Sequence, residues 1–203
     1  MDKKNSIFEK TYDYYKAQMA AIDLSSVGEV LGVETEGEKT IIPLFNKPFY
    51  VSRHGITDSS GVRPSFESCV VLFKYLIHPK GVPPENREWK AYRDFKDSGP
   101  LLSFFRSDAE DPIARYFSGR IEELKSTCIG LSGNPIDMGD SYNVAFELRA
   151  LPMVPVLLLF NDRDEEFPSD CSVLFRGDAD YFLDAECLAI LGSLLFKYLL
   201  SYS

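Results

Sequence analysis

Four carboxylates lie within five positions of one turn, and their types and spacing suggest chemistry more than any other residues of the chain. They are Asp162, Asp164, Glu165 and Glu166, directly after the most apolar stretch. Like charges this close repel one another unless they are solvated, paired or bridged by a cation. Hard cations such as Mg²⁺ and Ca²⁺ take carboxylate ligands. The turn is therefore a candidate cation or ligand patch, and it could serve a divalent-cation-dependent enzyme.

The same turn also has a structural interpretation that needs no ligand. Asp162 could cap a short helical turn, with Glu165 returning the second bond of a capping box. Phe167 would then point into the core. On this interpretation Asp164 and Glu166 have no structural role, which makes them the first residues to examine for function. An EF-hand is excluded because its glycine and its distal glutamate are absent.

Few other residues suggest a site. The only histidines are His54 and His78, and Arg53-His54 opens a polar loop, a better place for a site than the helix end at His78. Trp89 begins an aromatic stretch that could line a pocket for a planar ligand or fill the core. Arg53, His54 and Trp89 are the secondary candidates. No nucleophile elbow, phosphate loop or paired-histidine motif occurs, so catalytic residues are unknown and an enzyme is the less favoured hypothesis.

The four cysteines indicate reduced, buried thiols and no cofactor site. Cys69, Cys128, Cys171 and Cys187 form no C-x-x-C pair, so we expect neither a zinc knuckle nor an iron–sulfur cradle. The N-terminus has no apolar run typical of a secretory signal, which predicts a cytoplasmic protein. The cofactor is unknown. The one candidate that a cluster of side chains suggests is a Mg²⁺ or Ca²⁺ ion at the acidic turn.

Composition and charge limit the partners. The 203-residue chain has a net charge of −9, which excludes nucleic acid because such partners need a basic footprint. The same charge disfavours an anionic membrane surface. The longest apolar stretch is interrupted by Gly192, Ser193 and Lys197 and is too short to span a bilayer. A protein partner or a small ligand remains, and a homodimer through the apolar last helix is an alternative.

The elements that position these residues follow from apolar spacing. Spacings of three and four predict helices over residues 6–22, 65–77, 111–128 and 184–200. Alternating stretches predict strands over residues 40–45, 49–52, 142–148, 154–160 and 171–175. We therefore expect a single α+β domain over 1–203, with a mainly antiparallel sheet of about five strands packed with four to five helices.

The C-terminal third carries the most specific family resemblance. Its strings are Leu151-Pro152-Met153-Val154-Pro155, Asp164-Glu165-Glu166-Phe167-Pro168, Leu174-Phe175 and Tyr181-Phe182-Leu183. In these the chain resembles the microbial domain-of-unknown-function family 3786. Some members of that family are joined to a four-cysteine iron–sulfur domain of the kind seen in corrinoid methyl-transfer proteins. The resemblance implies a role near iron–sulfur or corrinoid one-carbon and redox metabolism, with any cluster on a partner because this chain lacks that domain.

Three functions stay open from the sequence. The leading hypothesis is a non-catalytic cytoplasmic binding or accessory protein, because the chain is acidic and carries no catalytic constellation. The first alternative is a divalent-cation-dependent enzyme that uses the acidic turn 162–166. The second is a structural subunit that forms homo-oligomers through its last helix.

Overall fold

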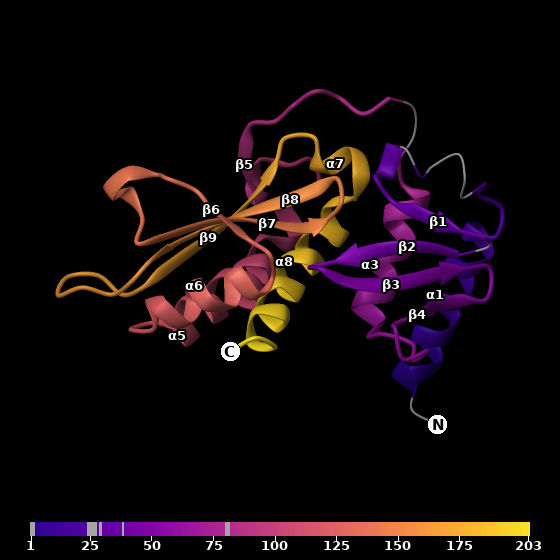
Figure 1. Ribbon diagram of the computed structural model, residues 1–203, viewed down its shortest axis with the longest axis horizontal. Helices are drawn as coiled ribbons and strands as arrows, with labels where there is room; N and C mark the ends of the chain where they lie inside the picture. The colour runs from indigo at the N-terminus through magenta and orange to yellow at the C-terminus, as the bar shows by residue number, and fades with distance from the viewer. Residues whose placement is uncertain (1–2, 24–27, 29, 38, 80–81) are drawn as a thin grey trace.

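The computed structural model describes residues 3–23, 28, 30–37, 39–79 and 82–203, which form helices and two sheets (Figure 1). The helices are α1 (Lys3–Met19), α3 (Phe66–Ile77), α4 (Leu102–Phe105), α5 (Asp111–Phe117), α6 (Ile121–Gly130), α7 (Ala179–Phe182) and α8 (Ala185–Leu200). The strands are β1 (Glu34–Glu36), β2 (Lys39–Leu44), β3 (Lys47–Ser52), β4 (Gly55–Thr57), β5 (Trp89–Ala91), β6 (Asn134–Pro135), β7 (Val144–Leu151), β8 (Val154–Asn161) and β9 (Asp170–Arg176).

Both sheets are antiparallel, which confirms the predicted α+β class. One sheet has the order β1-β2-β3-β4 and the other β5-β9-β8-β7-β6. The expected strands are found but divided between the sheets, since 40–45 and 49–52 pair with each other and not with the later three. The second sheet has five strands, because the short strands β5 and β6, which the sequence did not predict, complete it at its edges.

The predicted helices 65–77 and 184–200 are confirmed with capped N-termini. The Ser65 side chain accepts a hydrogen bond from the Ser68 N–H at 3.2 Å, and Asp184 accepts one from the Cys187 N–H at 3.0 Å. Such caps satisfy backbone donors that have no partner inside the helix. The expected helix 6–22 is found as α1 and ends earlier, at Met19.

The prediction of one helix over 111–128 is wrong. The chain leaves the helix between α5 and α6, where Gly119 has a positive φ of 73°. It is also helical before Asp111, because α4 continues through a π-helical turn, Arg106–Glu110. This turn aims Glu110 at strand β9, where its carboxylate accepts the Val173 N–H at 3.1 Å. Strand β5 pairs with β9 only over residues 174–176, so Glu110 covers a backbone donor that β5 does not reach.

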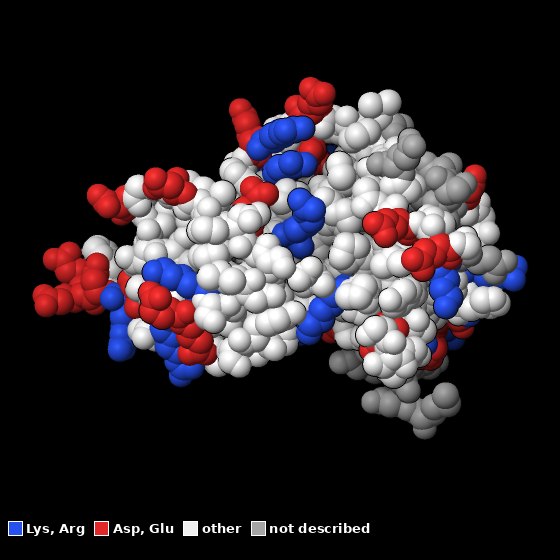
Figure 2. Space-filling model, in the orientation of Figure 1, with Lys and Arg blue, Asp and Glu red and all other residues white. Residues whose placement is uncertain are grey.

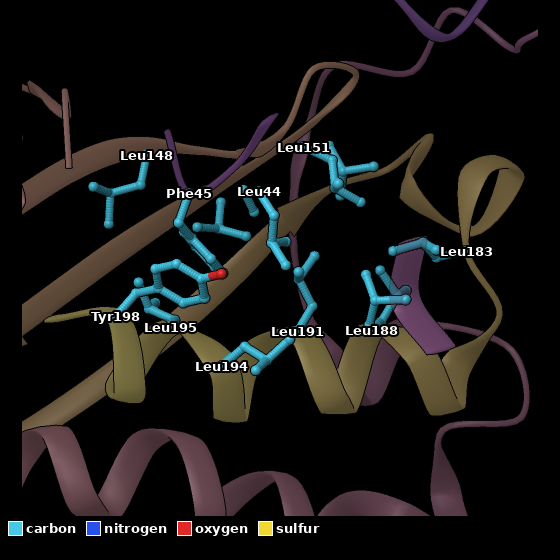
Figure 3. Close-up of a cluster of buried hydrophobic side chains, with 14 of the residues drawn as sticks. Leu44, Phe45, Leu148, Leu151, Leu183, Leu188, Leu191, Leu194, Leu195 and Tyr198 are labelled. Carbon is cyan, nitrogen blue, oxygen red and sulfur yellow. The ribbon is translucent and has the colours of Figure 1, made fainter. Parts of the chain in front are cut away.

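Helix α8 is the centre of the core. Figure 1 shows it under the junction of the two sheets, and Figure 3 shows its leucines facing Leu44 and Phe45, which lie between Leu148 and Leu151. These side chains belong to one continuous buried cluster that includes both sheets. No helix in the described parts of the chain is long and apolar enough to cross a membrane.

The β2–β3 hairpin docks its tip onto the second sheet. Its two turn residues, Phe45 and Asn46, have positive φ of 46° and 64°, as a two-residue hairpin turn with the right twist requires. The Phe45 N–H donates to the Ala150 carbonyl at 2.9 Å, and the Phe45 ring lies 5.0 Å from the Tyr198 ring. A bulky residue in this region is strained, so packing and a backbone bond between the sheets hold the turn.

Tyr75 ties three further segments together. Its buried hydroxyl donates to the Leu31 carbonyl at 2.7 Å and accepts the Met153 N–H at 3.0 Å. Burial raises the pKa of Tyr75, although the bond from Met153 opposes the shift. Helix α3 is therefore fastened both to the segment before β1 and to the β7–β8 turn.

Replacing Tyr75 with phenylalanine should lower the free energy of unfolding by about 2 kcal/mol, because a buried carbonyl and a buried N–H each lose their partner. Urea denaturation followed by circular dichroism measures this. Tyr14→Phe is the control, since Tyr14 is largely exposed at 62%. Equal stability of the two variants would contradict the role assigned to the Tyr75 hydroxyl.

Gly192 lets α8 approach the turn that precedes α5. A Cβ at this position would lie 2.5 Å from the Phe105 ring and 3.1 Å from the Ala109 Cβ. Gly192→Ala should therefore destabilise the protein by about 1–3 kcal/mol through overpacking, despite the better helix propensity of alanine. Gly99→Ala is the matched control, because no atom lies within 4 Å of its added Cβ. A thermal-melting comparison that ranks both variants alike would refute this account.

Candidate functional site

The acidic turn is the tip of the β8–β9 hairpin, which projects from the body of the protein (Figure 1). Figure 2 shows acidic side chains gathered at this end of the molecule. Phe167 is 66% exposed there, so the prediction that it packs into the core is wrong. The hairpin continues beyond the helices that cover the sheet, and this leaves no core for the ring to enter.

The predicted capping box of Asp162 and Glu165 is also wrong. The Asp162 carboxylate accepts the Gly119 N–H at 2.8 Å and so fastens the hairpin to the break between α5 and α6. Asp164 organises the tip instead, because its Oδ1 accepts the N–H groups of Glu166 and Phe167 at 2.8 and 2.7 Å. These two bonds lower the pKa of the Asp164 carboxyl. Asp164 thus has the structural role that the sequence assigned to its neighbours.

The four carboxylates do not converge. Asp162 and Asp164 direct oxygens at backbone amides, while Glu165 and Glu166 are exposed. In the described parts of the chain, no three histidine, cysteine, aspartate or glutamate side chains gather closely enough to hold a metal ion. Asp162 and Asp164 therefore have structural roles in the turn, but these differ from the roles predicted by the capping box.

The secondary candidates lie apart from the acidic turn. The β3–β4 turn, which carries Arg53 and His54, is at the opposite end of the molecule (Figure 1). There the Arg53 Nε donates to the His54 Nε2 at 3.2 Å, and His54 lines an open polar cavity of about 580 Å³. Trp89 is half-buried on β5, where it packs against the second apolar cluster with Leu157 and Leu159. The structure therefore places Arg53 and His54 beside each other, but brings neither of them to Trp89 or to the acidic turn (Figure 1).

Most of the aromatic stretch after Trp89 fills the core. Tyr92, Phe95 and Phe105 are buried, and the rings of Tyr92 and Phe105 stack at 4.3 Å. The four cysteines are buried free thiols, as predicted. Burial raises the pKa of Cys69 and of Cys128 to about 12, so these sulfurs stay protonated at neutral pH and are poor nucleophiles.

A cavity that the sequence did not indicate lies where the β2–β3 hairpin meets the end of α8. This cavity of about 410 Å³, the lysine pocket, is lined on its polar side by residues that carry ammonium or hydroxyl groups: Lys47, Ser65, Ser68, Lys197, Tyr198 and Ser201. Phe49 and Leu194 form part of its apolar wall. Ligand pockets commonly combine an apolar lining with a few polar groups and have volumes of roughly 300–1,000 Å³.

The two lysines of the pocket are held differently. Lys47 donates to the Ser201 hydroxyl at 3.2 Å, and its ammonium lies over the rings of Tyr198 and Tyr202 at 5.2 and 5.5 Å. Lys197 makes a looser, exposed ion pair with Glu67 at 3.5 Å. Exposed ion pairs of this kind contribute little free energy to stability. A ligand anion can therefore displace Glu67 from Lys197 at a small cost in free energy.

The rest of the polar wall favours an anion. Burial raises the pKa of Tyr198 to about 12, against a hydrogen bond with Ser68, so its hydroxyl keeps its proton at neutral pH. The Asp58 carboxylate also borders the pocket, but its Oδ1 already accepts the N–H groups of Ser60 and Val62 at 2.8 and 2.9 Å. The pocket therefore presents two ammonium groups and several hydroxyls, with its one lining carboxylate engaged by the backbone.

A weak signal for this pocket exists in the sequence. Lys197 interrupts the apolar stretch of the last helix, and in the sequence this interruption argues against a membrane span. A cation within an apolar stretch also indicates a place where the helix meets solvent or a ligand. Lys47 gives no signal of its own, because only the fold brings it to Lys197 from 150 positions away along the chain.

The class that the fold defines is an α+β protein of two antiparallel sheets joined over one buried helix. The chain belongs to the domain of unknown function family DUF3786, whose model matches residues 23–198. This confirms the resemblance seen in the C-terminal strings. No curated protein sequence and no solved structure matches the chain.

Asp164→Ala should destabilise the protein more than Glu165→Ala or Glu166→Ala, because it alone removes both bonds that organise the tip. The pKa of Asp164 is lowered in the folded state, so its contribution is present above the ordinary value of 3.8 and is lost as pH falls through the lowered pKa. Thermal melting at neutral pH and below pH 3 tests both points. A deficit of Asp164→Ala that does not shrink in acid would contradict the charge dependence.

Proposed function

We propose that this protein is a non-catalytic cytoplasmic binding or accessory protein that takes a small organic anion in the lysine pocket. The observation that carries the proposal is the approach of two ammonium groups, Lys47 and Lys197, to one cavity in a chain with a net charge of −9. Cations at a cavity in an acidic protein favour a negatively charged ligand over a neutral or cationic one.

The two walls of the pocket define the chemistry of that ligand. A carboxylate or phosphate group would receive hydrogen bonds from Lys47 and Lys197 and from hydroxyls such as Ser65. Charge-assisted hydrogen bonds of this kind are the stronger ones in proteins. The apolar wall of Phe49 and Leu194 would cover a hydrocarbon portion. The ligand class is therefore an organic anion with an apolar body.

The two alternative functions have less support. A divalent-cation-dependent enzyme would need the carboxylates of Asp162, Asp164 and Glu166 to converge, and the first two direct oxygens at backbone amides. A homo-oligomer through the last helix would need apolar surface on α8, yet Leu188, Leu191 and other α8 leucines are buried in the chain's own core. Any self-association would use another surface.

The accessory part of the proposal concerns a protein partner. Membership of DUF3786 supports it through the family's association with iron–sulfur domains of the corrinoid type. None of the four cysteines is exposed, so in this proposal any cluster lies on the partner. The organic anion would then be a ligand that this chain holds or senses beside that partner.

Isothermal titration calorimetry with hexanoate, hexyl phosphate, hexanol and hexylamine tests the ligand class. We expect the two anions to bind and the alcohol and amine to bind at least tenfold more weakly. Lys47→Gln and Lys197→Gln should each reduce the affinity for the anions by about 10- to 100-fold, the effect of losing one charge-assisted hydrogen bond of roughly 1.5–3 kcal/mol. The comparison of hexanoate with hexyl phosphate shows which head group fits.

Lys125→Gln is the matched control, because Lys125 pairs with Glu122 on the surface of α6, away from the pocket. It should leave anion affinity unchanged. Equal binding of hexanol and hexanoate, or full affinity in the Lys47→Gln, Lys197→Gln double variant, would overturn the proposal. Circular dichroism confirms that each variant is folded.

A further inference from the structure

A second cavity, the inter-sheet pocket, lies where the β2–β3 hairpin faces strand β7. Its volume is about 300 Å³, and it is lined by Pro43, Asn46, Leu131, Ser132, Asn134, Glu147 and Arg149. Along β7, strand β6 pairs as far as Glu147, and the hairpin tip bonds to Ala150. The pocket occupies the place between these two contacts, where neither β6 nor the hairpin covers the strand.

Two residues that line this pocket, Asn46 and Ser132, have left-handed backbone. Their φ values are 64° and 59°, and Phe45, beside Asn46 in the same hairpin turn, has a φ of 46°. Such conformations persist where surrounding contacts enforce them, and they cluster at ligand sites. Here the Asn46 side-chain amide donates to the Ser132 hydroxyl at 2.8 Å and joins the two strained turns. The walls of the pocket are therefore fixed.

Strand β7 brings two opposite charges to the pocket. Glu147 and Arg149 are two positions apart, so they share a face of the strand, and both line the cavity. A register shift between Arg149 and Leu151 marks a β-bulge, a feature that re-aims side chains next to functional sites. Neither residue takes part in any ion pair found among the described residues, including one with the other.

A separated cation and anion at one small cavity fit a ligand that carries both charges. A guanidinium binds a carboxylate through two parallel N–H groups, and a glutamate accepts the N–H groups of an ammonium. The side-chain amides of Asn46 and Asn134 supply further polar groups. The bond from Asn46 to Ser132 does not use all of their donors and acceptors. A ligand with a single charge would leave either Glu147 or Arg149 without a partner in the occupied pocket.

We propose that the inter-sheet pocket binds a free amino acid as its zwitterion, with the α-carboxylate on Arg149 and the α-ammonium on Glu147. The cavity of about 300 Å³ has room for a ligand of this size. This site is separate from the lysine pocket, although the β2–β3 hairpin contributes Asn46 to one and Lys47 to the other. The proposal does not depend on anion binding by the lysine pocket.

Calorimetric and thermal-shift titrations with the twenty standard amino acids test the site. We expect at least one to bind saturably, and its N-acetyl and amide derivatives to bind at least tenfold more weakly. Propionate and ethylamine, which carry one charge each, should bind at least tenfold more weakly than alanine. If no amino acid binds, or if a derivative with one blocked charge binds equally well, the proposal fails; the second result would point to a peptide terminus.

Variants separate this site from the rest of the protein. Arg149→Gln and Glu147→Gln should each reduce amino-acid affinity by at least tenfold. Arg115→Gln and Glu165→Gln are matched controls, because both residues are exposed and lie outside the cavity. The Lys47→Gln, Lys197→Gln double variant should keep amino-acid binding even where it loses hexanoate, so the two proposals fail independently. Full affinity in both the Arg149→Gln and Glu147→Gln variants would refute the site.

Discussion

The docking of Phe45 is the contact on which the rest of the structure depends. Its backbone takes a conformation that bulky residues avoid, and in return the Phe45 N–H bonds to Ala150 while the ring packs against Tyr198. One residue thus connects the first sheet to the second and to α8. Without it the hairpin tip would lose its backbone bond to the second sheet and would be held by packing and by side-chain bonds such as that from Asn46 to Ser132.

Both pockets follow from this contact. Two neighbouring residues at the hairpin tip each line a different cavity. Lys47 borders the space toward the end of α8, and Asn46 borders the space toward β7. Binding sites placed on a rigid junction of this kind need no large movement to form. The strained turn of the β2–β3 hairpin therefore borders both of these cavities.

The sequence predicted what local spacing determines. Helices α3 and α8, their caps and the three long strands of the second sheet follow from apolar periods. The division into two sheets was missed, because alternation in strands 40–45 and 142–148 does not say which partner each strand takes. The π-helical turn was missed because it places Glu110 beside the Val173 N–H, a partner 63 positions away along the chain. The outward Phe167 was missed because local spacing does not show that the hairpin extends beyond the helices that cover the sheet. The acidic turn was located, but Asp164, expected to have no structural role, organises its tip, while Asp162 bonds to Gly119 instead of capping the turn.

The central place of α8 has a consequence for synthesis of the chain. The helix follows both sheets in sequence, yet it supplies the leucines against which Leu44 and Leu148 pack. As the chain leaves the ribosome, the strands therefore emerge before the leucines that cover part of their apolar faces. Exposed strands of this kind are prone to aggregate. The order of elements along the chain thus makes burial of the core depend on its last helix.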